Sequence, residues 1–163
     1  MKTVLKISLA LTWFNLVVWG FIVAVGILMS FATGNMYGVL VAFLMAATVL
    51  HSYASLKLHK SIRHSNIPLS DQTPAGIRFV GFVALFVGIM YVGYGVALWQ
   101  TPGEFSKMNM AQMPAEYRNI DLTRIVRVMG VFCIIIGIFV GINVLLNIRL
   151  LRWYYLVKQS DIS

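Results

Sequence analysis

Four long stretches of apolar, almost uncharged residues constrain this chain more than any other feature. They lie at residues 7–32, 36–56, 75–99 and 125–148. A helix rises about 1.5 Å per residue, so crossing a hydrocarbon core roughly 30 Å thick takes about 20 apolar residues. Each stretch is long enough to cross with some tilt. The sequence therefore predicts an all-α, polytopic membrane protein, in which residues 1–163 form a single domain built as a four-helix transmembrane bundle.

The composition supports the same class of protein. Hydrophobic residues make up 60% of the chain and charged residues only 11%, whereas soluble domains carry about 25% charged residues. The net charge is +8, but the cations flank apolar stretches, which favours anionic lipids over nucleic acid as partners. The one cysteine, Cys133, lies within an apolar stretch, so no disulfide can form within the chain.

The distribution of cations predicts the orientation of the spans. Cytoplasmic loops of membrane proteins are enriched in Lys and Arg. Nine of the 13 Lys and Arg residues would share one side with the termini and the 57–74 loop, and four would lie on the side of the 100–124 loop. We therefore expect both termini and loop 57–74 to be cytoplasmic and loop 100–124 to be outside. The chain contains no Asn-x-Ser/Thr sequon, which fits a bacterial inner (plasma) membrane.

All three histidines lie in one short segment, at His51, His59 and His64. No two of them are three or four residues apart, so no pair can chelate a metal from one helical face. At about 100° per residue, His51 points to the bundle side and His59 lies between the two faces. The segment is predicted to be an amphipathic cytoplasmic extension of the second helix, whose basic face contacts lipid head groups through Lys57, Lys60, Arg63 and His64.

Four polar residues of the spans are expected to share one depth or nearly so: Asn15, His51, Asn143 and Asn147. A polar side chain in lipid needs a partner, and an ionisable one marks a candidate functional site. Two interpretations stay open. The side chains either hydrogen-bond between helices and fix their register, or they line a polar pocket, open to the cytoplasm, for a head group, a proton or a small polar ligand.

Small residues recur at helical spacing and predict close helix packing. They are Gly38, Ala42 and Ala46 in the second stretch and Gly130, Gly137 and Gly141 in the fourth. Small side chains let two backbones approach and gain dispersion contacts in lipid. These stripes either pack the four helices against one another or face a partner chain.

The outer loop holds three methionines, Met108, Met110 and Met113. Thioethers are soft ligands for Cu(I), so a copper site is one hypothesis. The alternative is that these methionines are ordinary apolar residues lying at the membrane interface.

Two arginines lie at the outer entrance of the fourth stretch, where both the positive-inside bias and the helix dipole disfavour cations. We expect Arg124 and Arg127 to form ion pairs with Asp121, Glu116 or Glu104, and the alternative is an anion or lipid site on the outer face. Asp121 is also placed to cap the start of that helix.

No catalytic motif and no cofactor signature stands out, so the sequence predicts a non-enzymatic protein without a cofactor. The leading hypothesis is an accessory or structural subunit of a larger membrane complex, partnered by anionic lipids and by other membrane subunits or itself. The alternative is a small homo-oligomeric channel or carrier lined by the four intramembrane polar residues. A weaker one is a metal-handling protein that uses the outer methionines.

Overall fold

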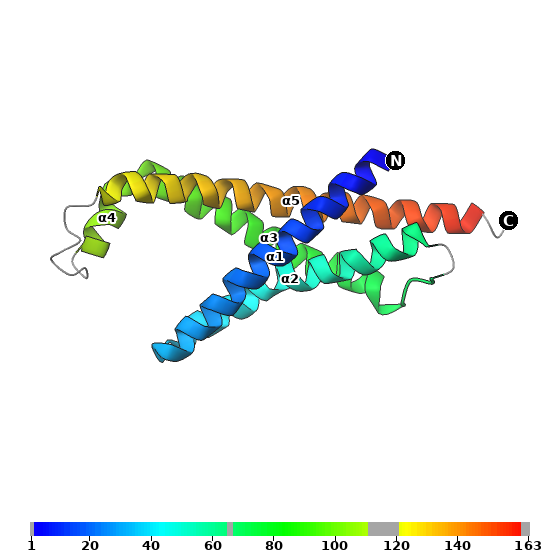
Figure 1. The fold of residues 1–163 in the computed structure, drawn as a ribbon, viewed down its shortest axis with the longest axis horizontal. Helices are drawn as coiled ribbons and strands as arrows, with labels where there is room; N and C mark the ends of the chain where they lie inside the picture. Colours follow the sequence, from blue (N-terminus) through cyan, green and yellow to red (C-terminus); the bar gives the residue numbers. More distant parts are fainter. Residues whose placement is uncertain (1, 65–66, 111–120, 161–163) are drawn as a thin grey trace. The chain divides into compact units, whose positions relative to one another are not determined.

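The computed structural model describes residues 2–64, 67–110 and 121–160, and every regular element in these ranges is a helix (Figure 1). The elements in chain order are α1 (Lys2–Ala32), α2 (Met36–Arg63), α3 (Gln72–Gln100), α4 (Pro102–Met110) and α5 (Leu122–Ser160). Within these ranges, four helices are long and apolar enough to cross a membrane, namely α1, α2, α3 and α5. The predicted all-helical class and the four candidate spans are thus confirmed.

The helices extend past the apolar stretches that predict them. Helix α2 continues to Arg63, seven residues beyond the apolar stretch, and α5 continues to Ser160. Hydropathy detects only the part of a helix that suits hydrocarbon, whereas backbone hydrogen bonds continue into the polar region. The chain between the second and third apolar stretches therefore begins and ends as helix.

A tight turn joins α1 to α2. Gly34 has a φ of 66°, a left-handed conformation that glycine adopts without the steric cost of a Cβ. The next residue, Asn35, caps α2 because its side-chain oxygen accepts a hydrogen bond of 3.1 Å from the Gly38 N–H. Its own N–H donates to the Ser30 carbonyl at 2.8 Å, which closes α1. These local bonds make α1 and α2 an antiparallel pair (Figure 1).

The chain divides into two compact units. The first contains the described residues up to Val87 together with those from Phe139 onward, so it holds α1, α2 and parts of α3 and α5. Its apolar core lies near the ends of the helices that carry most of the cations. That core is formed by four buried side chains: Leu58, Ile77, Leu150 and Leu151.

The second unit contains Gly88–Ile138, and α3 meets α5 there through glycines. A Cβ placed on Gly137 would lie 2.5 Å from the Gly88 carbonyl oxygen, and one on Gly95 would lie 2.6 Å from that of Gly130. Such distances leave no room for a side chain, so glycine is what allows the two backbones to approach.

Exposure of side chains is inverted relative to a soluble protein. Large apolar side chains are exposed, including Phe21 at 71% and Phe79 at 75%, while Ser8 and Asn147 are completely buried. Lipid is as apolar as a protein core, so exposed Phe costs nothing there and buried polar groups need partners within the protein.

Candidate functional site

One face of α1 carries the polar side chains that enter the first unit. Ser8, Thr12 and Asn15 are spaced four and three residues apart, which puts them on one helical face. At most 1% of each is exposed. This face is therefore buried against other helices although it is polar.

The partners of this face lie on α5, at Asn143 and Asn147. Thr12 Oγ1 donates to Asn143 Oδ1 at 2.9 Å, and Ser8 Oγ donates to Asn147 Oδ1 at 3.1 Å. Asn147 Nδ2 in turn donates to Asn143 Oδ1 at 2.9 Å and to Thr12 Oγ1 at 3.3 Å. These bonds tie α1 to α5 at two successive turns.

Helix α2 joins the network through His59, which is only 5% exposed. Its Nε2 lies 3.2 Å from Ser8 Oγ. Ser8 has one hydroxyl proton and donates it to Asn147, so Ser8 can only accept from the imidazole. His59 Nε2 therefore carries a proton, and Nδ1 is the nitrogen left without a hydrogen-bond partner among the described residues. We call Ser8, Thr12, His59, Asn143 and Asn147 the polar core.

The remaining two residues of the predicted layer, Asn15 and His51, lie outside the polar core. Asn15 Nδ2 donates to the Phe139 carbonyl at 3.4 Å, so it too connects α1 to α5. The His51 ring lies against Gly81 of α3, where an added Cβ would be 3.0 Å from the ring atoms Cε1 and Nδ1. The four residues are all buried, but the structure joins only Asn143 and Asn147 directly.

Sequence reasoning missed three members of the polar core: Ser8, Thr12 and His59. Ser and Thr are common in membrane helices, where they can hydrogen-bond the backbone of their own helix, so each one alone carries little signal. Ser8 and Thr12 lie on the same face of α1 as Asn15, and this spacing could have identified them from the sequence. His59 was placed between two helical faces, and only its neighbours in space decide that it is buried.

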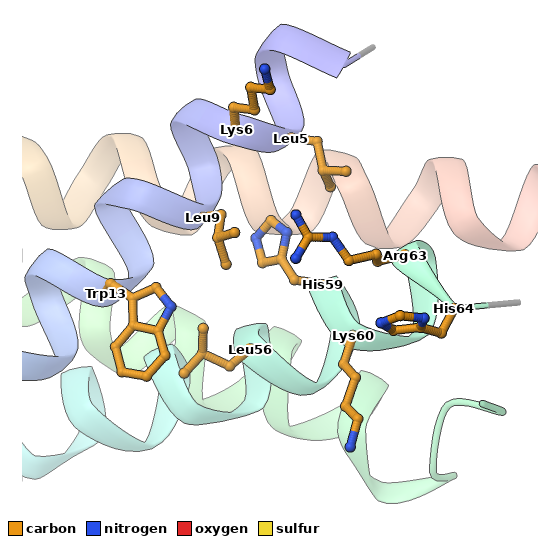
Figure 2. Close-up of a pocket in the computed structure, with 9 residues that line it drawn as sticks. All are labelled: Leu5, Lys6, Leu9, Trp13, Leu56, His59, Lys60, Arg63 and His64. Carbon is orange, nitrogen blue, oxygen red and sulfur yellow. The ribbon is translucent and has the colours of Figure 1, made fainter.

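A cavity of about 280 Å³ opens between α1 and α2, with His59 in its wall (Figure 2). Its apolar part is formed by Leu5, Leu9, Trp13 and Leu56, and its polar part by Lys6, His59, Lys60, Arg63 and His64. No carboxylate of the described residues lines it. We call it the basic cavity.

The basic face predicted for the end of α2 divides in the structure. Lys60, Arg63 and His64 line the basic cavity, and Figure 2 shows Arg63 directed toward the His59 ring. Lys57 instead lies over the Tyr53 ring, with its Nζ 4.8 Å from the ring centroid, in a cation–π contact. Lys6 of α1 joins the cavity from the other helix and was not part of the prediction.

A second cavity, of about 370 Å³, lies between α1 and α5. Its wall contains two arginines, Arg149 and Arg152, beside Trp153. No buried polar atom without a partner is found there among the described residues, which distinguishes it from the basic cavity.

Five of the six small residues named in the sequence lie close to another helix of the chain. Gly38 faces the Ser30 side chain across the α1–α2 turn, and Ala42 lies opposite Gly26. Gly130 and Gly137 pack on α3 in the second unit, and Gly141 lies beside Leu85 in the first. Ala46 is half-buried.

At the predicted outer end, Asp121 Oδ1 accepts a hydrogen bond of 3.2 Å from the Arg124 N–H, which confirms it as a cap of α5. Arg127 stacks over the Trp99 ring at 5.7 Å. Met113 and Glu116 lie outside the described residues, as do the side chains of Met108 and Met110. Across the described ranges, no group of three or more His, Cys, Asp or Glu residues is placed to hold a metal ion.

Comparisons with protein-family models, curated protein sequences and solved structures find no match for this chain. The class of protein is therefore inferred from the fold and from the buried polar side chains alone. In the part that the structure describes, the chain is all-helical, has four helices of membrane-spanning length and apolarity, and encloses a buried polar core.

Proposed function

We propose that this chain is a non-enzymatic integral membrane protein that acts as an accessory or structural subunit of a larger membrane complex. The observation that supports the proposal is that the intramembrane polar side chains hydrogen-bond to one another. Ser8, Thr12, Asn143 and Asn147 hydrogen-bond one another and are at most 1% exposed. These hydrogen bonds join α1 to α5, and the contact of Ser8 with His59 adds α2, so three helices are held together as a rigid scaffold needs.

The competing proposal is a homo-oligomeric channel or carrier lined by Asn15, His51, Asn143 and Asn147. A pathway along these residues would need their polar atoms to face water or a solute. In the single chain, Asn143 Oδ1 already accepts from Thr12 and Asn147, and the His51 ring rests on Gly81. The geometry therefore favours the scaffold.

We further propose that both termini are cytoplasmic and that the membrane is a bacterial inner membrane. The support is the distribution of Lys and Arg, nine of 13 on the side of the termini. Single cysteines introduced near each end of the spans in a Cys133→Ser background, and labelled with an impermeant maleimide in intact cells, test the orientation. Labelling of a cysteine in the 57–74 loop before lysis would contradict it.

The experiment that tests the subunit role is purification of the tagged chain in a gentle detergent followed by native mass spectrometry. We expect a stoichiometric complex with at least one other membrane protein. A homo-oligomer alone that conducts ions or transports a solute in liposomes would contradict the proposal. In that case Asn143→Leu should abolish the flux, whereas Leu145→Ala, at a position 60% exposed on the same helix, should leave it unchanged.

A further inference from the structure

The basic cavity has the form of a binding site for one lipid head group. The helices that form it are antiparallel, so the start of α1 lies opposite the end of α2 (Figure 1). Trp13 and Leu56 thus lie at one end of the cavity, and Lys6, Arg63 and His64 at the other. The wall changes from apolar to cationic along the helix axes, as a phospholipid changes from acyl chain to phosphate.

Cations of both helices are available to a phosphate in this cavity. Lys6 comes from α1, and Lys60 and Arg63 come from α2. In Figure 2 the two lysines extend to opposite sides, and Arg63 lies between the helices next to Leu5 and the His59 ring. A planar guanidinium can bind two phosphate oxygens at once, while lysine brings its charge on a flexible stem.

The second, independent indication of a ligand is the orientation of His59. The polar core occupies Nε2, because Ser8 can only accept from it. His59 is 5% exposed and lines the cavity, and its Nδ1 is a buried atom without a partner among the described residues. In the neutral ring Nδ1 is a hydrogen-bond acceptor, so a ligand group that hydrogen-bonds to it must donate an O–H or N–H.

We propose that the basic cavity binds the head group of an anionic phospholipid that carries a hydroxyl group. The phosphate lies between Lys6, Lys60 and Arg63, the hydroxyl donates to His59 Nδ1, and an acyl chain leaves the cavity past Leu9, Trp13 and Leu56. A volume of about 280 Å³ suits a head group rather than a whole lipid. Trp13, at 53% exposed, continues the wall into the lipid-facing surface. This inference does not depend on the subunit role.

Native mass spectrometry of the full chain in nanodiscs, with three lipids of equal chain length, tests the proposal. Phosphatidylglycerol is anionic and has hydroxyls, phosphatidylethanol is anionic and has none, and phosphatidylcholine is zwitterionic. We expect one phosphatidylglycerol to be retained, with an affinity about fivefold above phosphatidylethanol for one neutral hydrogen bond and at least tenfold above phosphatidylcholine.

Variants separate the two parts of the site. Lys60→Gln with Arg63→Gln should lower retention of both anionic lipids roughly 25-fold, at about fivefold per cation. His59→Gln keeps an amide at the position of Nε2 to bond Ser8 but has no equivalent of Nδ1, so it should remove only the preference for phosphatidylglycerol over phosphatidylethanol. Arg78→Gln removes a cation of α3 outside both cavities and should change neither value.

Three results would overturn the proposal. One is equal retention of phosphatidylcholine and phosphatidylglycerol by the unaltered chain. The second is an effect of Arg78→Gln as large as that of the double variant, which would mean that general charge attracts the lipid. The third is displacement of the bound lipid by millimolar inorganic phosphate or glycerol phosphate, which would make the site one for a free phosphate. His59→Gln is interpreted only if its thermal unfolding in detergent matches that of the unaltered chain; otherwise the lipid comparison in the unaltered chain decides.

Discussion

Gly95→Ala in α3 gives the sharpest test of how the second unit is packed. The added Cβ would lie 2.6 Å from the Gly130 carbonyl oxygen, 2.8 Å from Ile134 Cγ1 and 2.9 Å from the Ile134 nitrogen. Two of these three atoms are backbone, so no side-chain rotation relieves the overlap. Helices α3 and α5 must separate or shift.

The size of the effect follows from these distances. Ordinary contact begins at 3.4 Å, so the shortest contact is about 0.8 Å too close. A gap of 0.5–1 Å forfeits roughly a quarter to a half of each dispersion contact along the interface. Overpacking in cores generally costs about 1–3 kcal/mol, and we expect Gly95→Ala to lower the free energy of unfolding by about 2 kcal/mol.

The same helix supplies a matched control. Gly93 has no atom within 4 Å of the position of an added Cβ. Alanine is the better helix former by roughly 0.5–1 kcal/mol, so Gly93→Ala should be neutral or slightly stabilising. Reversible unfolding of both variants by SDS titration in mixed micelles, followed by circular dichroism, measures the difference. Equal stability of Gly95→Ala and Gly93→Ala would refute the close contact of α3 with α5.

Three further variants test the first unit. Asn147→Leu removes four hydrogen bonds to Ser8, Thr12 and Asn143. At roughly 0.6 kcal/mol per bond in a membrane, it should lower the free energy of unfolding by about 2 kcal/mol in the same assay. A cost below that of the exposed Leu145→Ala control would contradict the polar core. His51→Leu should change stability by less than about 1 kcal/mol, because Nδ1 has no partner among the described residues and the contact of Nε2 with Ser55 Oγ is long, at 3.5 Å. Loss of the folded protein would contradict this. Asn35→Ala removes the α2 cap and should cost about 1 kcal/mol, with faster proteolysis at the α1–α2 turn as a local readout; unchanged proteolysis would count against the cap.

The polar residues show how far sequence patterns reach. Amides and imidazoles are rare and costly in lipid, so the sequence identifies four candidate site residues: Asn15, His51, Asn143 and Asn147. The structure buries all four. The pattern does not say which of them meet. Asn143 and Asn147 are one turn apart and contact each other, whereas His51 faces α3 and Asn15 reaches the Phe139 backbone.

His59 shows the opposite case, a residue whose role no local pattern reveals. It is followed by Lys60 in a segment with an exposed basic face, so periodicity alone places it at the border of that face. Ser8 lies 51 residues away in the chain, and its contact with Nε2 leaves Nδ1 as the His59 nitrogen without a partner among the described residues. Hydropathy carries no information on such a pair, since it sums over neighbours in sequence.

The sequence by itself determined the all-helical class and the four candidate spans, but not helix α4 (Pro102–Met110) within the predicted 100–124 loop. The reason is that apolar length and backbone hydrogen bonding within a helix are local properties, as are the Gly34–Asn35 turn and the Asp121 cap. Only the tertiary structure decided which helical faces meet. It joined Ser8, Thr12, His59, Asn143 and Asn147 into one hydrogen-bonded core, and it turned a basic helix end into a cavity shared by α1 and α2. Those outcomes depend on the rotation and depth of each helix relative to its neighbours, which are set by side-chain contacts between residues far apart in the chain.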